Sequence, residues 1–420
     1  MQLSMPQSVA LVLIGVTRLQ PLGAQASLNL EDALREAHAA NTQLPLAAFE
    51  SRIAAAALRE ARGALGPRFS LDGDLHGGSP AEYAGNDGRL QLLAQQPIYD
   101  GGALRAGVAV QRALFGASQA RYRQAEKDLD FDVRVGFAQL LELDSVIAVR
   151  SEGITRLRSY RAAIGARRAA GEGVAGDLLR TDVQLGQAEA DLADASRQRD
   201  LARLALNDLL GRDPDAPLTL TEGAAPSVPP PDTGAAAWSG APEVRQAEAQ
   251  VTAARSGTAL AAAERRPQLD LAVNAGTQPA FGTAGSGFNN GRGQGVELLL
   301  SLSWPLLDAG GYRARRDQAR LRLAAAQAGE VAARRQVRLA WAAARTELAA
   351  RYEEVETRRR TAAAALDSYL TSESLYRGGA ATALEVLEAY ATWKAANEDV
   401  TQAVFNSRVA EAELVRWGTP

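Results

Sequence analysis

The residues that most often bind metals or act as nucleophiles are nearly absent from this chain of 420 residues. It contains no cysteine and only two histidines, His38 and His76, which lie far apart in the sequence. Disulfides, thiolate metal sites, cysteine nucleophiles and an acylated N-terminal cysteine are therefore excluded. Residues 72–74 (Asp-Gly-Asp) begin like a calcium loop without its other ligands, and the glycine-rich residues 291–295 precede a strand, whereas dinucleotide-binding loops follow one. We expect no metal, no cofactor and no enzymatic activity.

Acidic residues recur at one spacing after a glycine in two places. Asp177 follows Gly171 by six positions, and Glu385 follows Gly379 by six positions, 208 residues later. Each acid falls in the first turn of an expected helix, where the helix dipole alone favours a negative charge. A further acid, Glu388, follows one turn later and could be an ordinary exposed helix residue.

This spacing belongs to a larger internal repeat. Residues 97–102 (PIYDGG) return as residues 305–310 (PLLDAG), again 208 positions later. Pro67 returns as Pro267 at an offset of 200, so eight residues have been inserted in the second copy. Two offsets, each shared by several residue types, indicate that the chain contains two copies of one unit.

The first 26 residues have the pattern of an export signal. Residues 9–16 (VALVLIGV) form an apolar run, and residues 24–26 (Ala-Gln-Ala) form a cleavage site. No lysine or arginine precedes the run, so the true start codon stays open, and a short buried helix is the alternative. No later run approaches the ~18 apolar residues of a transmembrane helix. The predicted organisation is a signal peptide (1–26), a first repeat (27–225), a proline-rich linker (226–240) and a second repeat (241–420).

Each copy contains two segments in which apolar and mostly polar residues alternate. They cover residues 68–76 and 89–98 in the first copy, and 268–275 and 296–304 in the second. This period of two predicts β-strands joined by glycine-rich loops. Strands of ~9–11 residues have the length that crosses a bilayer at a tilt.

One face of these strands is apolar, and the other is polar like the wall of a water-filled lumen. Tyr99 and Trp304 stand at strand ends, where the aromatic girdle of a barrel interface would lie. Two soluble hairpins packed on helices are the alternative. An open sheet edge is not stable in lipid, so the four strands of each chain would have to form a closed barrel with those of other chains. Such a barrel would have 8 strands in a dimer or 12 in a trimer. Composition does not choose between these numbers.

The expected helices are too long for an ordinary compact domain. Residues 103–170 and 311–376 contain no proline, and ~66 helical residues span about 100 Å. Shorter helices are expected near 30–65 and 176–211. Two short helices match one long helix in length, so we expect them to stack end to end beside it. The dense charges of the long helices fit a solvated coiled-coil face, and alanines on the other faces permit close packing.

Together, the two-copy layout, the PIYDGG motif and the glycine followed by an acid resemble the TolC family of bacterial outer-membrane efflux proteins, over residues 28–417. The resemblance implies a mainly α fold with a membrane β-barrel: a long α-helical coiled-coil barrel, plus four strands per chain in a shared 12-stranded trimeric barrel. It implies a passive duct of a tripartite efflux or type I secretion system, located in the outer membrane of a Gram-negative bacterium and extending into the periplasm. The implied partners are two further copies in a homotrimer, a periplasmic adaptor (membrane fusion) protein, an inner-membrane pump and outer-membrane lipid.

The resemblance also implies roles at the end of the helices that faces the pump, the periplasmic tip. Asp177, Glu385 and Glu388 match acids that form a ring at the gate, where crowded like charges raise one another's pKa and attract cations. Tyr376 matches a tyrosine that helps to hold the tip closed. The residues implied to form the tip turns and the adaptor-docking surface are Gly171, Gly173, Val174, Ala175, Gly379, Ala380 and Thr382.

One residue departs from the family pattern. An arginine found two positions after the motif glycine in well-studied members is Ala381 here. The corresponding gate bond is therefore absent, or Arg377 or Arg180 replaces the arginine.

Charge and composition exclude other functions. The net charge is −3, and no strongly basic segment stands out, so we expect no nucleic-acid binding. A soluble, secreted helical coiled-coil scaffold or adhesin is the alternative to the duct, and dependence on detergent would separate the two.

Overall fold

The structure, a computed structural model, describes residues 27–42, 44–76, 87–171, 174–221, 238–277 and 294–418. The predicted signal peptide and nearly all of the predicted linker lie outside the described residues. No helix in the described ranges is both long and apolar enough to cross a membrane. The elements are α1 (Leu30–Ala40), α2 (Leu44–Gly63), β1 (Arg68–His76), β2 (Asp87–Tyr99), α3 (Ala103–Ala169), α4 (Ala175–Leu209), α5 (Pro242–Ala263), β3 (Gln268–Thr277), β4 (Gln294–Ser303), α6 (Gly311–Arg377) and α7 (Ala383–Trp417).

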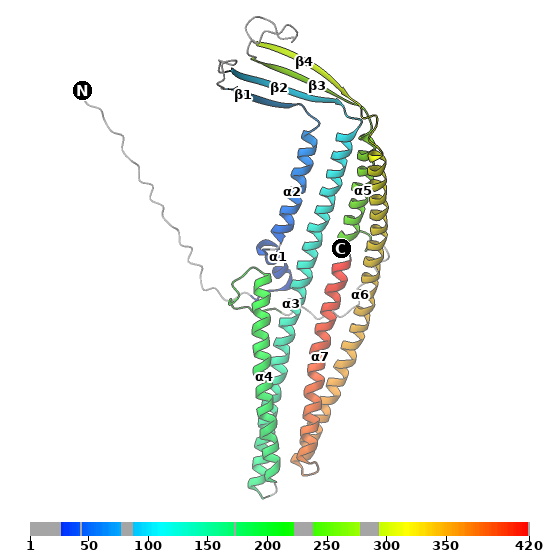
Figure 1. Cartoon of the computed structure of the whole chain (residues 1–420). Helices are drawn as coiled ribbons and strands as arrows, with labels where there is room; N and C mark the ends of the chain where they lie inside the picture. The colour runs from blue at the N-terminus through cyan, green and yellow to red at the C-terminus, as the bar shows by residue number, and fades with distance from the viewer. Residues whose placement is uncertain are drawn as a thin grey trace, which may run out of the picture.

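Two long helices set the height of the molecule. α3 and α6 have 67 residues each, which at ~1.5 Å per residue is about 100 Å. Figure 1 shows α2 and α4 following one another along α3, and α5 and α7 following one another along α6. The expected stacking of short helices beside each long one is therefore present, and the sheet lies at the end of the molecule that α2, α3, α5 and α6 reach.

The single helix expected over residues 30–65 is wrong, because the chain forms two helices there. α1 ends at Ala40, and Asn41 leaves the helical conformation with ψ 138°. The Asn41 side-chain oxygen then accepts a hydrogen bond from the Leu44 N–H at 3.2 Å, at the start of α2. Arg212 holds α1 in place by donating hydrogen bonds of 2.6 and 2.5 Å to Glu36. The other expected helix boundaries agree with the structure to within two residues, the largest difference being the end of α4 at Leu209 instead of residue 211.

The four strands form one antiparallel sheet in the order β1-β2-β3-β4. Its register places Leu71 opposite Leu92, Leu92 opposite Ala275, and Ala275 opposite Val296. Directly paired residues project from the same face, so this row and its neighbours make one apolar face. That face is open to the surroundings in the single chain, since Leu71 is 66% exposed and Val296 is 71% exposed.

The opposite face of the sheet is mainly polar. Ser70 and Asp72 on β1 share it with Asn274 on β3 and Glu297 on β4, because they occupy the alternate positions of the same register. In the described part of the chain, no strand pairs with the outer edge of β1 or of β4. The sheet therefore has two free edges, one at each side.

The repeated aspartate and glycine motif turns the chain from the sheet into the long helices. Asp100 accepts hydrogen bonds from backbone N–H groups in the first turn of α3, and Asp308 accepts one from the Tyr312 N–H at 2.5 Å in α6. Gly101 has a positive φ of 68°, which glycine adopts without steric cost. In the second copy Ala309 takes this place with φ 51°, alone among the described non-glycine residues.

Candidate functional site

Both helix reversals lie at the end of the molecule opposite the sheet (Figure 1). Gly171 follows α3 with φ 84°, and Gly379 follows α6 with φ 79°. At the second turn, the Ala380 N–H donates to the Leu375 carbonyl at 2.8 Å, and the Gly379 N–H donates to the Tyr376 carbonyl at 3.0 Å. A side chain in this left-handed region costs ~1–2 kcal/mol, so glycine is the residue that fits each reversal.

The two acids that follow the glycines are used differently. Glu385 and Thr382 form a capping box at the start of α7: a Glu385 carboxylate oxygen accepts from the Thr382 N–H at 2.9 Å, and the Thr382 hydroxyl accepts from the Glu385 N–H at 3.3 Å. Asp177 lies in the first turn of α4, where the cap residue is Val174 and offers no side-chain acceptor. Only the second acid is therefore tied to its own helix end in this way.

Glu388 lies one turn further along α7, on the exposed side of that helix. Leu384 and Glu385 share this exposed side, whereas Val386 and Leu387 are buried. Among the described residues, no side chain pairs with the Glu388 carboxylate. It is therefore available to other groups, including other copies of the chain.

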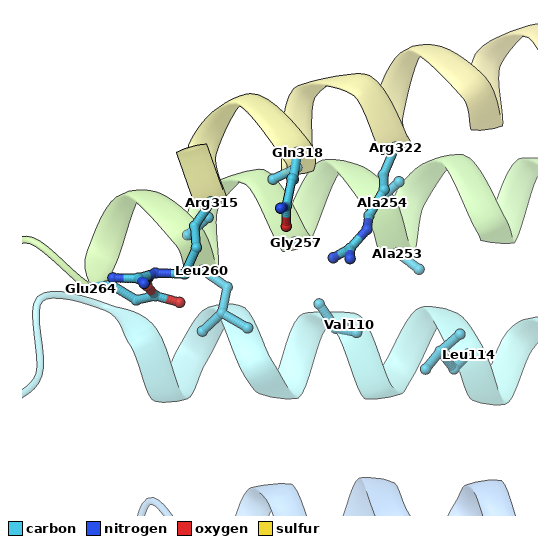
Figure 2. Close-up of a pocket in the computed structure, with 12 residues that line it drawn as sticks. Val110, Leu114, Ala253, Ala254, Gly257, Leu260, Glu264, Arg315, Gln318 and Arg322 are labelled. Atoms are coloured by element: carbon cyan, nitrogen blue, oxygen red, sulfur yellow. Dashed lines mark hydrogen bonds and ion pairs between the residues drawn. The ribbon is translucent and has the colours of Figure 1, made fainter. Parts of the chain in front are cut away.

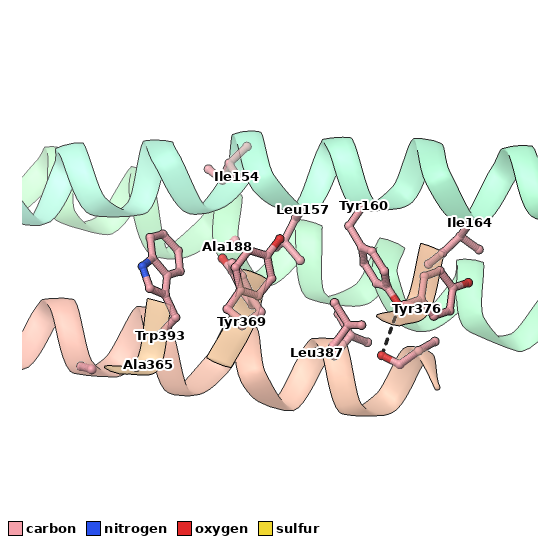
Figure 3. Packing of buried hydrophobic residues seen from close by; sticks show 14 of the residues in the cluster. Ile154, Leu157, Tyr160, Ile164, Ala188, Ala365, Tyr369, Tyr376, Leu387 and Trp393 are labelled. Atoms are coloured by element: carbon pink, nitrogen blue, oxygen red, sulfur yellow. Dashed lines mark hydrogen bonds between the residues drawn. The ribbon is translucent and has the colours of Figure 1, made fainter. Parts of the chain in front are cut away.

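Tyr376 is buried at the end of α6 and contacts α3. Its ring packs edge-on against Tyr160 at 5.1 Å between centroids and 65° between planes. Arg167 of α3 lies 5.0 Å above the Tyr376 ring and donates a hydrogen bond of 2.7 Å to the Tyr376 carbonyl. The Tyr160 hydroxyl donates to the Ala383 carbonyl of α7 at 3.3 Å, as Figure 3 shows. These contacts join the α3–α4 hairpin to the α6–α7 hairpin, and we call them the tip clasp.

The electrostatics of the clasp follow from its burial. Burial raises the pKa of Tyr376, and the nearby positive charge of Arg167 opposes that rise. Burial also raises the pKa of Tyr160, with a further increase from the charge of Tyr376 and Asp177. Both hydroxyls are therefore neutral near pH 7, and the clasp carries one positive charge, from Arg167, with the Asp177 carboxylate near by.

An aromatic cluster continues the same interface away from the tip (Figure 3). Tyr369 of α6 stacks on Trp393 of α7 at 6.1 Å, and the Arg156 guanidinium of α3 lies 4.8 Å from the Trp393 ring. Tyr390 packs beside both aromatic residues, and its hydroxyl would be 2.7 Å from a Cβ placed on Gly153. Gly153 thus lets α3 and α7 approach closely at this crossing.

Charged groups link the hairpins above the aromatic cluster. Arg150 of α3 donates to Glu398 of α7 at 2.9 Å and to the Asp191 carbonyl of α4 at 2.5 Å. Lys394 of α7 donates to the Asp191 carboxylate at 2.6 Å, and this bond is the main reason why the pKa of Asp191 lies below its ordinary value. Three helices are therefore joined at one level.

The described part of the chain gathers no three His, Cys, Asp or Glu side chains that could hold a metal ion. What the tip arrangement offers instead is two helical hairpins joined by the tip clasp, the aromatic cluster and the charged groups above it. Such a junction can separate without breaking either hairpin, because each turn has its own internal hydrogen bonds.

Comparison with known proteins gives the family. Residues 22–212 and 235–417 match the family described as Outer membrane efflux protein. The chain belongs to this family. No curated protein sequence matches it.

Solved structures of outer-membrane channels share the fold of this efflux protein. CusC, whose transmembrane channel formation has been described, aligns with a TM-score of 0.84 at 19% identity, over 94% of this chain and 93% of that one. The outer membrane protein VceC of Vibrio cholerae aligns with a TM-score of 0.79 at 19% identity, over 92% and 95%. The open MtrE outer membrane channel of Neisseria gonorrhoeae aligns with a TM-score of 0.76 at 20% identity, over 92% and 88%. The mainly helical fold with its four-stranded sheet is therefore that of the efflux channels.

The arginine at the clasp is not one that the sequence suggested. Arg377 pairs with Glu373 of its own helix at 2.6 Å and is exposed, so it does not replace the family's arginine on Tyr376. Arg180 is exposed on α4. Among the described residues, Arg167 of α3 is the arginine that contacts Tyr376.

Sequence reasoning missed six residues of this interface: Arg156, Tyr160, Arg167, Tyr369, Tyr390 and Trp393. One signal was present, since aromatic residues are only 5% of the chain. Against this low background Tyr369 and Tyr376 stand at i and i+7, and Tyr390 and Trp393 at i and i+3, which predicts two aromatic helix faces. The pairing of those faces with α3 had no signal in the sequence.

The remaining candidate residues that the structure describes lie near the two ends of the molecule. Val174 is 67% exposed before α4, and Ala380 and Thr382 are exposed between α6 and α7. α4 begins at Ala175, and Gly173 lies outside the described residues. At the other end of the molecule, the exposed Tyr99 ends β2, and the exposed Trp304 follows β4.

Proposed function

We propose that three copies of this efflux protein form a passive duct from the periplasm through the outer membrane. The observation that carries the proposal is the sheet, which has one exposed apolar face and two free edges at one end of helices about 100 Å long. An exposed apolar face suits lipid, whose hydrocarbon core is ~30 Å thick. The helices are about three times longer, so most of their length would lie in the periplasm.

Closure of the sheet requires other copies. A free strand edge in lipid leaves backbone N–H and C=O groups without partners, so β1 of one copy would pair with β4 of the next. The helices support the same arrangement, since α2 lies on the β1 side of the molecule and α6 on the β4 side (Figure 1). One head-to-tail contact would therefore join both the strands and the helices.

Exposed apolar residues mark the helix surfaces that this contact would bury. Leu46, Phe49 and Ile53 lie on one face of α2 at i, i+3 and i+7 and are 53–69% exposed. Leu321 and Leu339 of α6 are five helical turns apart, share a face and are 70% and 71% exposed. Each surface lacks a cover within its own chain, and each would meet the other in a ring of copies.

The number three comes from the resemblance to the trimeric channels of the family, with 12 strands in the shared barrel. The tip would then receive cargo from an inner-membrane pump through a periplasmic adaptor, which would contact Val174, Ala380 and Thr382. Opening would separate the two hairpins at the tip clasp. Glu388 and Asp177 of three copies would line the narrow passage and attract cations.

The mass of the protein extracted from outer membranes in mild detergent, with the detergent mass subtracted, tests this proposal. We expect three chains. Two chains would indicate an eight-stranded barrel, which contradicts the trimer. A monomer in the soluble fraction would contradict the duct altogether and favour the scaffold alternative.

A further inference from the structure

Arginines surround the ends of the four helices that meet the sheet. We define the arginine band as residues 54–67, 100–113, 254–267 and 304–322, the stretches that lead into or out of the strands. The band contains twelve arginines, no lysine and five acidic residues, a net charge of +7. All twelve arginines are exposed.

The band stands out against the rest of the chain. The whole chain has a net charge of −3, so the residues outside the band carry −10. The band occupies only about three helical turns, because the α6 portion from residue 311 to 322 rises ~18 Å. A strong positive charge is therefore confined to one level, directly beside the apolar sheet.

Part of this charge has no carboxylate to neutralise it. Arg313 and Arg316 lie on one face of α6 at i and i+3, and neither pairs with an acidic side chain in the described ranges. Arg320 continues that face and is 3.6 Å from Asp317. On the neighbouring side, Arg315 is paired with Glu264 at 2.6 Å.

A groove of about 620 Å³ lies within the band, between α3, α5 and α6. Val110, Leu114 and Leu260 form apolar parts of its wall. Figure 2 shows Gln318 and Arg322 extending from α6 across α5 toward α3, above these apolar residues. A groove with an apolar wall and a guanidinium at its rim suits a molecule with an apolar body and an anionic head.

We propose that the arginine band binds the phosphodiester headgroups of anionic glycerophospholipids in the bilayer leaflet that faces the helices. This inference rests on the proposed function, which places the sheet in lipid and the band at the headgroup level of that leaflet. Guanidinium groups bind phosphate through paired N–H donors, and arginine is the only basic residue of the band. The apolar wall of the groove would contact the glycerol and the first carbons of an acyl chain.

The contact between copies gives a second reason for an anionic ligand. Head-to-tail closure would bring α6, with Arg313 and Arg316, beside α2 of the next copy, whose final turns carry Arg59, Glu60 and Arg62. Positive side chains would outnumber acidic ones at this level of the seam. A phosphodiester between them would replace repulsion with charge-assisted hydrogen bonds.

Lipid binding to the purified protein in mild detergent tests the proposal. Native mass spectrometry would count bound dioleoylphosphatidylglycerol and, in a parallel titration, dioleoylphosphatidylcholine, which has the same acyl chains and no net charge. The variant Arg313→Gln/Arg316→Gln removes two arginines of the band on α6 that pair with no acidic side chain in the described ranges. The matched control is Arg335→Gln/Arg338→Gln, which has the same spacing on the same helix, is also exposed, and lies about 33 Å further from the sheet.

We expect phosphatidylglycerol to bind in preference to phosphatidylcholine, and its affinity to fall roughly 25-fold in the band variant, since each basic residue near an anionic lipid surface contributes about fivefold. The control variant should bind like the unaltered protein. Equal binding of the two lipids, or an equal loss in the control variant, would overturn the proposal. So would full competition by millimolar inorganic phosphate, because the site would then recognise a free anion.

The same spectra give the number of chains. A trimer that shows no lipid preference would contradict this inference and leave the duct intact. A monomer would contradict the duct itself.

Discussion

Replacing Arg167 with glutamine is expected to loosen the tip clasp. Arg167 contacts the end of α6: its guanidinium lies 5.0 Å from the Tyr376 ring, and it donates to the Tyr376 carbonyl at 2.7 Å. A partly exposed cation–π contact contributes ~0.5–1 kcal/mol, and a hydrogen bond from a charged donor ~1.5 kcal/mol. Glutamine is shorter and neutral and keeps neither contact. The lost free energy of about 2 kcal/mol corresponds to a roughly 30-fold higher population of separated hairpins.

Hydrogen exchange measured by mass spectrometry on the assembled protein would detect this change. Peptides that cover residues 164–171 and 374–386 should exchange faster in Arg167→Gln, while the sheet remains protected. Arg377→Gln is the matched control, because within the described ranges Arg377 forms its ion pair with Glu373 of its own helix. In a double-mutant cycle, Tyr376→Leu should add little once Arg167 has been replaced. Unchanged exchange in Arg167→Gln, or the same increase in the control, would refute the clasp.

Three further predictions concern the tip, a turn and pH. Glu388→Gln is expected to weaken block by multivalent cations in single-channel recordings without lowering the melting temperature; unchanged block would remove Glu388 from the constriction. Ala309→Gly should raise the melting temperature, because relief of the positive φ is worth up to ~1 kcal/mol; a lower value would argue against strain there. The pKa of Asp191 is lowered mainly by Lys394. The pair therefore stabilises the folded protein at pH values above the ordinary carboxyl pKa of ~4, and this stabilisation is lost as the pH falls below that value. Thermal melting between about pH 6 and pH 3 should therefore show a smaller decline in Asp191→Asn than in the unaltered protein.

The elements that the sequence predicted correctly are those with a long, local pattern. The strands show a period of two, and the long helices have no proline over more than sixty residues, so neither depends on distant parts of the chain. The break after α1 was missed because its signal is a single residue. Asn41 is compatible with a helix interior and with a cap, and only the contact of α1 with α3 and Arg212 decides between them.

The clasp shows the limit of sequence reasoning at the site. Gly171 and Gly379 could be placed at helix reversals from the sequence, because few residues other than glycine adopt the positive φ that such a reversal needs. Arg167 and Tyr376 are 209 positions apart, and their contact depends on how α3 and α6 are rotated relative to each other. No local sequence pattern predicts that rotation.

The arginine band could not be predicted from the sequence either. No single segment of the chain is strongly basic, and the positive charge accumulates only when four helix ends come together in the fold.

The two acids at equivalent places in the repeat cannot contribute equally to a cation-attracting ring. The Glu385 carboxylate already accepts a hydrogen bond from the Thr382 N–H, and its negative charge interacts with the N-terminus of α7. At α4 the equivalent cap is Val174, so Asp177 forms no capping box and lies near Tyr160 and Tyr376 instead. Removal of Glu385 would therefore weaken a helix end by ~1 kcal/mol and alter conduction for structural reasons. No side chain in the described ranges pairs with Glu388, so a change in cation block on its replacement would be expected to report on the proposed passage and not on a helix end.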